Sequence, residues 1–237
     1  MTEPLLNVSG LDAWYGGSHI LHSVALNVDE GESIALLGRN GAGKSTLLKA
    51  LLDAGPRSSG LIEFGGQSLT GMSTENRARA GLMLVPEDRR IYPDITVTEN
   101  IALGRIAARG RGASVSMEDI WQSFPLLEPL KDRGGGQLSG GQQQLVAVAR
   151  GVFGCARLLC LDEPVEGLAP VVVDEMARDI ARLRKMGLSL LIAEQNLAFV
   201  RACTERVFLI DSGVIVFSGN WQDFDADPTL KDRYLAV

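Results

Sequence analysis

The sequence predicts an α/β fold with a mostly parallel sheet at its core, an antiparallel β part at the N-terminus and an inserted helical sub-domain. From residue 33 onwards, short apolar runs alternate with amphipathic helical patterns, as in sheets covered by helices on both faces. Residues 5–36 instead show apolar stretches broken by glycine-containing turns. The pattern over 97–150 is helical. We therefore expect one domain, residues 1–237, with the helical sub-domain at residues 88–150.

Turns and periodicity predict the first elements. Gly16-Gly17 and the turn at 29–31 divide the N-terminal stretch into short antiparallel strands. SIALLG, residues 33–38, is a compact buried strand that runs into a glycine-rich turn. Gly55-Pro56 ends the helix that follows. Leucines at helical spacing mark that helix: Leu47, Leu48, Leu51 and Leu52. Residues 61–66 are expected to form the next strand.

The second half of the chain alternates strands with helices. Four buried strands are expected, at residues 82–86, 156–164, 188–195 and 206–210. The last continues through a turn at 211–213 into a hairpin with VIVF, residues 214–217. An apolar stripe marks a long helix after the second of these strands: Val172, Val173, Met176, Ile180 and Leu183.

Composition and charge exclude several classes of protein. The chain is 46% hydrophobic and carries a net charge of −6, so we expect no nucleic-acid partner. Neither an apolar run of about 20 residues nor a signal-peptide pattern occurs in the sequence. Cys155, Cys160 and Cys203 lack paired spacing, which favours reduced thiols in the cytoplasm over disulfides or a zinc site. Any membrane contact is therefore expected to come through a partner.

GRNGAGKS, residues 38–45, fits the phosphate-binding pattern G-x-x-x-x-G-K-[ST] between a predicted strand and helix. The glycines let backbone N–H groups approach phosphate oxygens, Lys44 brings charge to the β- and γ-phosphates, and Ser45 offers a hydroxyl to Mg²⁺. A flexible glycine turn is the weaker alternative, because both flanking elements fit the motif. The predicted nucleotide-binding residues here are Gly38, Arg39, Asn40, Gly41, Ala42, Gly43, Lys44, Ser45 and Thr46, with ATP and Mg²⁺ as cofactors.

Two acids end the apolar strand in LLCLDEP, residues 158–164. Asp162 is predicted to hold Mg²⁺ through water, and Glu163 to polarise the attacking water as general base. Strand ends often carry acids, so the pair alone is a weak signal. Its position downstream of a phosphate-binding loop makes it a strong one.

A small polar loop begins the helix predicted within QLSGGQQQLVAVAR, residues 137–150. The backbone N–H groups at Ser139, Gly140 and Gly141, with the serine hydroxyl and the helix dipole, are suited to cap a phosphate. A serine N-cap followed by a glycine turn explains the same residues. Taken by itself, the loop leaves both interpretations open.

Together these motifs resemble the ABC ATPase family, whose own mark is LSGGQ, residues 138–142, between the P-loop and the acidic strand end. The resemblance covers nearly the whole chain and implies a P-loop NTPase (RecA-like) fold with ATPase activity. In that family two cassettes pair head to tail, and the LSGGQ loop of one closes over the ATP of the other. The residues implied to act in trans are Ser139, Gly140, Gly141 and Gln142.

The resemblance also implies roles for further positions. Tyr15 matches the aromatic residue that stacks on adenine, with Trp14 as the competing choice. Glu87 stands where a glutamine that reaches Mg²⁺ is common, and Ala169 where the family usually has aspartate. Gln195 holds the place of a histidine that contacts the γ-phosphate. The predicted metal ligands are Ser45, Glu87 and Asp162.

Gln195 is expected to slow the site without abolishing its activity. An amide can donate one hydrogen bond and accept another, but it carries no positive charge. Glutamine orients the hydrolytic water in small GTPases. Losing a charge-assisted donor costs about 1–2 kcal/mol, roughly tenfold in rate. The predicted catalytic residues are Lys44, Glu163 and Gln195.

Three segments narrow the resemblance to an ATPase subunit of branched-chain amino-acid importers, or of the related amide and urea importers: residues 85–101, 163–170 and 193–196. It implies a peripheral subunit at the cytoplasmic face of the inner membrane. The implied partners are a second ABC ATPase subunit in a homo- or heterodimer, two membrane permeases and, indirectly, a periplasmic binding protein. Arg89 and Arg90 either pair with acids of a permease or face solvent. The alternatives are a non-transport ABC ATPase in DNA repair or translation and a degenerate regulatory ATP-binding subunit.

Overall fold

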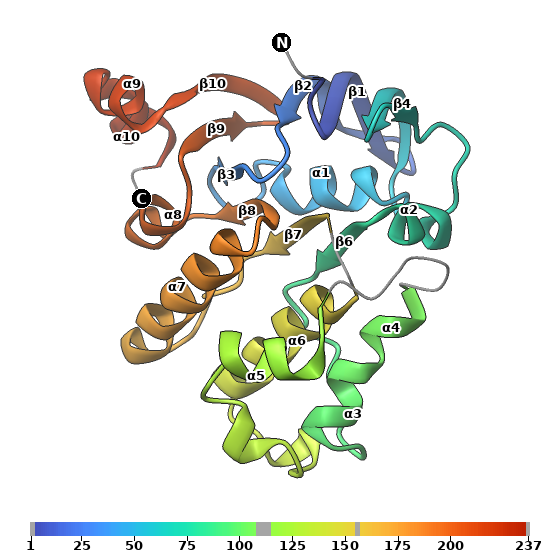
Figure 1. Cartoon of the computed structure of the whole chain (residues 1–237). Coiled ribbons are helices and arrows are strands. Elements are labelled where there is room, and N and C mark those ends of the chain that lie inside the picture. The colour runs from blue at the N-terminus through green and yellow to red at the C-terminus, as the bar shows by residue number, and fades with distance from the viewer. Residues whose placement is uncertain (1–2, 108–114, 155–156, 236–237) are drawn as a thin grey trace.

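A computed structural model describes residues 3–107, 115–154 and 157–235, which form two sheets and the helices packed on them (Figure 1). The smaller sheet has the strand order β2-β1-β4-β5, and the larger has the order β10-β9-β3-β8-β7-β6. Figure 1 shows α1 between the two sheets and α5, α6 and α7 on the opposite side of the larger one. The predicted combination of a mostly parallel sheet with an N-terminal antiparallel part is confirmed.

The antiparallel sheet is built on a hairpin of β1 (Leu6–Tyr15) and β2 (Ser18–Val28). Tyr15 pairs with Ser18, so Gly16-Gly17 form the turn, as predicted. The strands have 10 and 11 residues and are longer than predicted. The pairing of β1 with β2 shifts in register between Val8 and Ala13. The strand β1 therefore continues through the positions where the apolar pattern of the sequence is interrupted. The sheet is completed by β4 (Arg57–Phe64) and β5 (Gln67–Ser68).

The larger sheet places five parallel strands side by side and adds one antiparallel strand at its edge. Its strands are β3 (Ser33–Leu37), β6 (Leu82–Val85), β7 (Leu158–Asp162), β8 (Ser189–Glu194), β9 (Arg206–Asp211) and β10 (Val214–Asn220). All residues of β3, β7 and β8 are buried, as expected for parallel strands covered on both faces. The structure describes nothing of Ala156, which the sequence assigns to the strand that forms β7.

Two apolar cores lie on opposite faces of this sheet, because alternate residues of a strand point to opposite sides. In β3, Ile34 and Leu36 belong to the core shared with α1 and the antiparallel sheet. Ala35 and Leu37 belong to the core shared with the helices beyond. The central strands therefore hold both halves of the molecule together.

The helices fill the connections between strands, and the stretch predicted to be helical contains several short ones. They are α1 (Lys44–Leu51), α2 (Thr74–Ala80), α3 (Val97–Ala102), α4 (Gly104–Ala107), α5 (Met117–Ser123), α6 (Gly140–Phe153), α7 (Pro170–Lys185), α8 (Leu197–Cys203), α9 (Trp221–Ala226) and α10 (Thr229–Tyr234), with 3₁₀ turns η1 (Glu128–Leu130) and η2 (Gly135–Gln137). The division into one domain with a helical sub-domain at 88–150 remains a prediction. In the described part of the chain, no helix is both long and apolar enough to cross a membrane.

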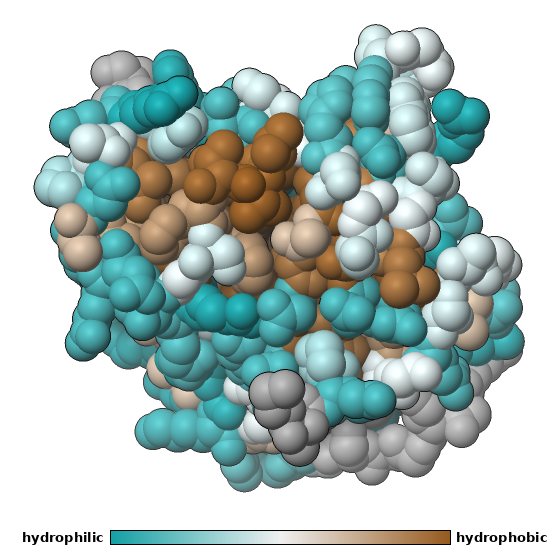
Figure 2. Space-filling model, turned by 90° about the horizontal axis from the view of Figure 1, so that it is seen from above, coloured by the Kyte–Doolittle hydropathy of each residue, from teal (hydrophilic) through white to brown (hydrophobic). Residues whose placement is uncertain are grey.

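The edge strand β10 differs from the buried strands beside it. Its residues alternate between exposed and half-buried, and Val214 and Val216 are 42% and 37% exposed. Figure 2 looks down on the side of the molecule where β10 lies and shows hydrophobic side chains gathered in the middle of that face, with hydrophilic ones around them. An antiparallel edge strand can carry such a pattern because one of its faces is not covered by helices.

The two described cysteines are structural. Cys160 and Cys203 are free and buried, and burial raises the pKa of both thiols. Neither is therefore a reactive thiolate. Cys155 lies outside the described residues.

The turn between β9 and β10 packs against the phosphate-binding loop, and Gly213 makes the contact. Its N–H donates to the carbonyl of Ala42, and its carbonyl accepts from the N–H of His22, both at 2.9 Å. Its φ is +78°, and a Cβ atom there would lie 1.8 Å from the carbonyl oxygen of Ile20. Only glycine fits this position.

We expect Gly213→Ala to lower the free energy of unfolding by roughly 3 kcal/mol, because left-handed strain adds to a backbone clash. Denaturant unfolding measures this change. Gly187→Ala is the matched control, since Gly187 has a φ of +80° and a Cβ atom added there would meet nothing within 4 Å; it should show the strain alone, about 1 kcal/mol. Equal losses in the two variants would show that the contact with Ile20 is unimportant.

Candidate nucleotide-binding and catalytic site

The phosphate-binding loop, Glu87, the acid pair and Gln195 meet at one end of the larger sheet, since they follow the parallel neighbours β3, β6, β7 and β8. Asp162 at the end of β7 pairs with Ala193 of β8, and Leu37 at the end of β3 pairs with Glu194. The segments that follow these strands therefore lie side by side. Ligands of open α/β sheets bind at the carboxyl ends of the strands.

A pocket of about 410 Å³ opens at the start of α1. Gly43 is the N-cap of this helix at a φ of +109°, and no side chain caps the helix start. Backbone N–H groups at such an end are suited to bind an anion. Glu87, Glu163 and Glu166 also line this pocket, together with Ile20. The residues of the predicted phosphate-binding loop that line it are Asn40, Gly41, Gly43, Lys44, Ser45 and Thr46.

Lys44 joins the loop to the acidic strand end. Its ammonium group donates to the carbonyls of Gly38 at 2.8 Å and Arg39 at 3.2 Å. It also forms an ion pair with Glu163, with Nζ 3.0 Å from Oε1, and both side chains are buried. Lys44 is the one cation among the residues that line the pocket, which suits it to neutralise phosphate charge.

Ser45 and Asp162 lie in direct contact, with the hydroxyl donating to Oδ1 at 2.9 Å. Burial raises the pKa of Asp162, and the hydrogen bond from Ser45 acts in the opposite direction. Among the described residues, no group of three or more His, Cys, Asp or Glu could hold a metal alone. Mg²⁺ at phosphate sites needs only one or two protein ligands besides phosphate oxygens and water. Ser45 and Asp162 therefore fit the predicted metal ligands, and Glu87 lines the same pocket.

Glu163 occupies a strained position just after β7. Its φ is +47°, a region that non-glycine residues rarely adopt and that is common at functional sites. Its N–H donates to the carbonyl of Ala193 at 2.9 Å, which holds the turn against β8. A hydrogen bond to Glu163, together with the charge of that carboxylate, raises the pKa of Glu166 to about 7. The Glu166 carboxyl group is therefore partly protonated near neutral pH.

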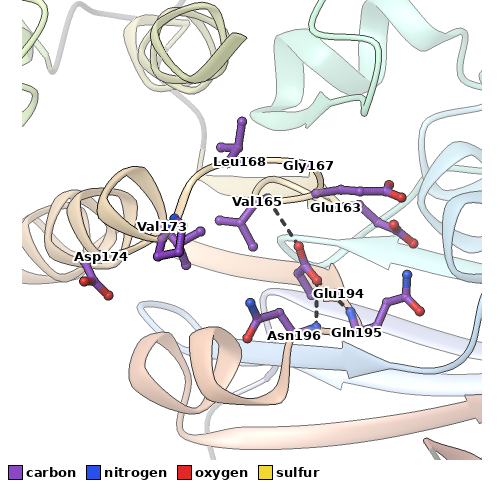
Figure 3. Close-up of a pocket in the computed structure, with 11 residues that line it drawn as sticks. Glu163, Val165, Gly167, Leu168, Val173, Asp174, Glu194, Gln195 and Asn196 are labelled. Carbon is purple, nitrogen blue, oxygen red and sulfur yellow. Dashed lines mark hydrogen bonds between the residues drawn. The ribbon is translucent and has the colours of Figure 1, made fainter. Parts of the chain in front are cut away.

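Gln195 lies in a neighbouring pocket of about 560 Å³, which Glu163 also lines (Figure 3). In Figure 3 the side chains of Glu163 and Gln195 lie on one side of the pocket, whereas Val173 and Asp174 lie at the other end. The structure thus brings the predicted base and the residue at the histidine position to one place. Glu166 lines both pockets, so the two form one region.

Tyr15 does not line either of these two pockets. It is 42% exposed at the end of β1, and its hydroxyl lies 3.7 Å from the position that a Cβ atom on Gly55 would take. The ring of Trp14 already has two partners. It stacks on His19, with the ring centroids 4.6 Å apart, and the guanidinium carbon of Arg57 lies 4.8 Å from its centroid. Tyr15 therefore keeps the more accessible ring, and its contact with adenine stays a prediction.

The loop at the start of α6 forms a capping box. The Ser139 hydroxyl accepts from the N–H of Gln142, and the Gln142 side chain accepts from the N–H of Ser139. The N-cap interpretation is therefore correct for this loop. Ser139, Gly140, Gly141 and Gln142 line neither pocket described above. Their contact with the nucleotide of a second chain stays a prediction.

The two arginines after Glu87 behave differently. Arg90 forms an exposed ion pair with Asp88 at 3.1 Å. Arg89 instead points at α6 and donates to the Gln144 side chain at 3.1 Å. Arg150, in the last turn of the same helix, donates to the carbonyls of Arg89 and Arg90 at 2.7 and 2.8 Å. Arg89 is thus an internal contact, whereas Arg90 carries the solvent-exposed charge.

The sequence predictions do not name several residues that line the two pockets, among them Ile20, Glu166 and Glu194. Ile20 comes from β2 and has no motif around it. Glu194 is nearly fully buried, 3% exposed, and its carboxylate accepts hydrogen bonds from three backbone N–H groups. An acid at the end of an apolar run is the signal that identified Asp162, and the same signal is present at Glu194.

The fold and the site together define a P-loop ATPase. A family model described as ABC transporter matches residues 21–166. The chain belongs to this family, as an ATP-binding subunit.

Known proteins of similar length resemble the chain from end to end. It is 33% identical over 231 residues to the high-affinity branched-chain amino acid transport ATP-binding protein BraG of Pseudomonas aeruginosa, covering 98% of this chain and 99% of that one. It is 30% identical to the lipopolysaccharide export system ATP-binding protein LptB of Escherichia coli, covering 97% and 96%. A nucleotide-free ATP-binding cassette from an ABC transporter shares the fold, with a TM-score of 0.80 at 23% identity over 96% and 97%.

Proposed function

We propose that this ATPase drives import of branched-chain amino acids through membrane permeases at the cytoplasmic face of the inner membrane. The observation that carries the proposal is the 33% identity to BraG, a branched-chain amino acid transport ATP-binding protein, over nearly the full length of both chains. The importer-like segments 85–101, 163–170 and 193–196 add to it. A second ABC ATPase subunit, identical or different, completes the motor, and a periplasmic binding protein delivers the substrate.

The hydrolytic mechanism that we propose uses the side chains gathered at the sheet end. The loop amides and Lys44 hold the β- and γ-phosphates, and Tyr15 stacks on adenine. Ser45, Glu87 and Asp162 hold Mg²⁺, which supplies charge neutralisation at the phosphates. Glu163 accepts the proton of the attacking water. The residues proposed to contact the nucleotide of the second subunit are Ser139, Gly140, Gly141 and Gln142.

Gln195 orients the attacking water in this proposal. Its amide can accept from water and donate to the γ-phosphate at the same time. It lies beside Glu163 in the pocket of Figure 3, which supports a shared role around one water molecule. A subunit that uses glutamine here is slower than one that uses a charged histidine by roughly tenfold.

Export is the competing direction of transport, and the similarity to LptB of a lipopolysaccharide export system supports it. The test is to reconstitute the chain in vesicles with the permeases and second ATPase encoded beside its gene, with ATP inside and the binding protein outside. We expect saturable, ATP-dependent uptake of labelled leucine. Uptake of urea or an amide in place of leucine, or no uptake of any of these solutes by an ATP-hydrolysing complex, would reject the proposed substrate.

A further inference from the structure

Glu194 is a buried carboxylate that none of the proposed hydrolytic steps uses. It is the last residue of β8, is 3% exposed, and lies directly before Gln195. Its Oε2 accepts from the N–H groups of Gln195 at 2.7 Å and Asn196 at 2.9 Å. Its Oε1 accepts from the N–H of Val165 at 3.2 Å. All three partners are donors, which an ionised carboxylate satisfies with both oxygens.

These hydrogen bonds join two loops that are far apart in sequence. Val165 belongs to the turn that carries Glu163, and Gln195 begins the loop after β8. Figure 3 shows Glu194 between the two loops, with its hydrogen bonds reaching to both. The N–H of Glu163 donates to the neighbouring carbonyl of Ala193, so the end of β8 contacts the turn twice.

We propose that Glu194 is a positioning residue that sets Gln195 relative to Glu163 for hydrolysis. The inference rests on the roles proposed above for these two residues. Glu194 does not line the pocket over the phosphate-binding loop, so its effect falls on the hydrolytic step and not on nucleotide binding. It lines the neighbouring pocket together with both residues that it positions.

The isosteric variant Glu194→Gln removes the hydrogen bond to one of the two loops and keeps the hydrogen bonds to the other. An amide has one oxygen that accepts and one nitrogen that only donates. Two N–H groups face Oε2 and one faces Oε1, so the amide oxygen takes the Oε2 place. The NH₂ group then opposes the N–H of Val165, and the link to the turn of Glu163 is lost while the Gln195 loop keeps its anchor.

The experiment measures ATP turnover of the complex assembled with its second ATPase subunit. Glu194→Gln is expected to lower kcat about tenfold and to leave KM for ATP within about twofold of the parent, which corresponds to loss of an interaction made in the transition state. The matched control is Glu205→Gln, because Glu205 also accepts a backbone N–H, from Ser33 at 3.0 Å, at the opposite end of β3. It should retain the parental kcat. Thermal unfolding of each variant separates misfolding from mispositioning.

A double-mutant cycle with Gln195→Ala identifies which proposal fails. Gln195→Ala alone is expected to lower kcat about tenfold, and adding Glu194→Gln should lower it by less than about twofold more, since no side chain is left to position. If Gln195→Ala has no effect, the proposed role of Gln195 fails and this inference fails with it. If Gln195→Ala slows turnover but Glu194→Gln does not, or if the two losses multiply in full, only the positioning role is refuted.

Discussion

Glu163→Gln is expected to reduce phosphate release by at least about a hundredfold, because an amide cannot accept a proton from the attacking water. ATP binding should persist. The amide oxygen can take over the contact of Oε1 with Lys44, now 3.0 Å, and the shape of the side chain is unchanged. The variant should therefore hold ATP and turn over slowly.

Two measurements on the assembled complex check this expectation: steady-state phosphate release and titration with Mg-ATP. Glu118→Gln, at an exposed position on α5, is the control and should match the parent in both. Turnover near the parental rate in Glu163→Gln would remove Glu163 from the role of general base. Slow turnover with lost ATP binding would show that Glu163 acts on binding instead.

Lys44→Ala is expected to weaken ATP binding by about a hundredfold or more, the equivalent of about 3 kcal/mol for a lost charge-assisted contact. Lys44 is the one cation among the residues that line the pocket, and it also bonds to the loop carbonyls of Gly38 and Arg39. Its removal therefore takes away both the charge at the phosphates and the internal brace of the loop.

Isothermal titration of the isolated chain with Mg-ATP measures the loss of affinity. Lys185→Ala, at an exposed position near the end of α7, is the control and should bind ATP as the parent does. Circular dichroism and thermal unfolding show whether the Lys44 variant still folds. Saturable uptake of ATP at the parental affinity by folded Lys44→Ala would contradict the proposed phosphate site and, with it, the proposed mechanism.

Local patterns were sufficient to predict the parts of the site that lie at strand ends. An apolar run followed by glycines identifies β3 and its loop, and an apolar run followed by acids identifies β7 with Asp162 and Glu163. Residues that follow parallel strands lie at the carboxyl edge of the sheet, where ligands bind. The family resemblance, and not a local pattern, identified Gln195. The parallel arrangement of β3, β8 and β7 brings it and Glu163 together, as the pairing of Asp162 with Ala193 shows.

Side-chain contacts between distant segments could not be predicted in the same way. Arg77 is an example, because a charged residue on the short helix α2 is buried in the structure. Its guanidinium donates to carbonyls of Ala50, Leu51, Leu69 and Met72. Burial of the charge is tolerable only because these carbonyls converge there, and no periodicity in the sequence records that convergence. Glu194 differs, because its place at the end of an apolar run was visible in the sequence, but its contact with the backbone of Val165 was not.

The hydrogen bonds between α6 and the turn at residues 88–90 have a mechanical consequence. Gln144 holds the side chain of Arg89, and Arg150 holds the main chain of Arg89 and Arg90. The Arg89 guanidinium also lies 3.0 Å from the position that a Cβ atom on Gly140 would take, so the turn touches the start of α6, where Ser139 is the N-cap. A neighbouring protein that pressed on the exposed turn would therefore transmit its push to the loop at Ser139 across a single side chain, that of Arg89.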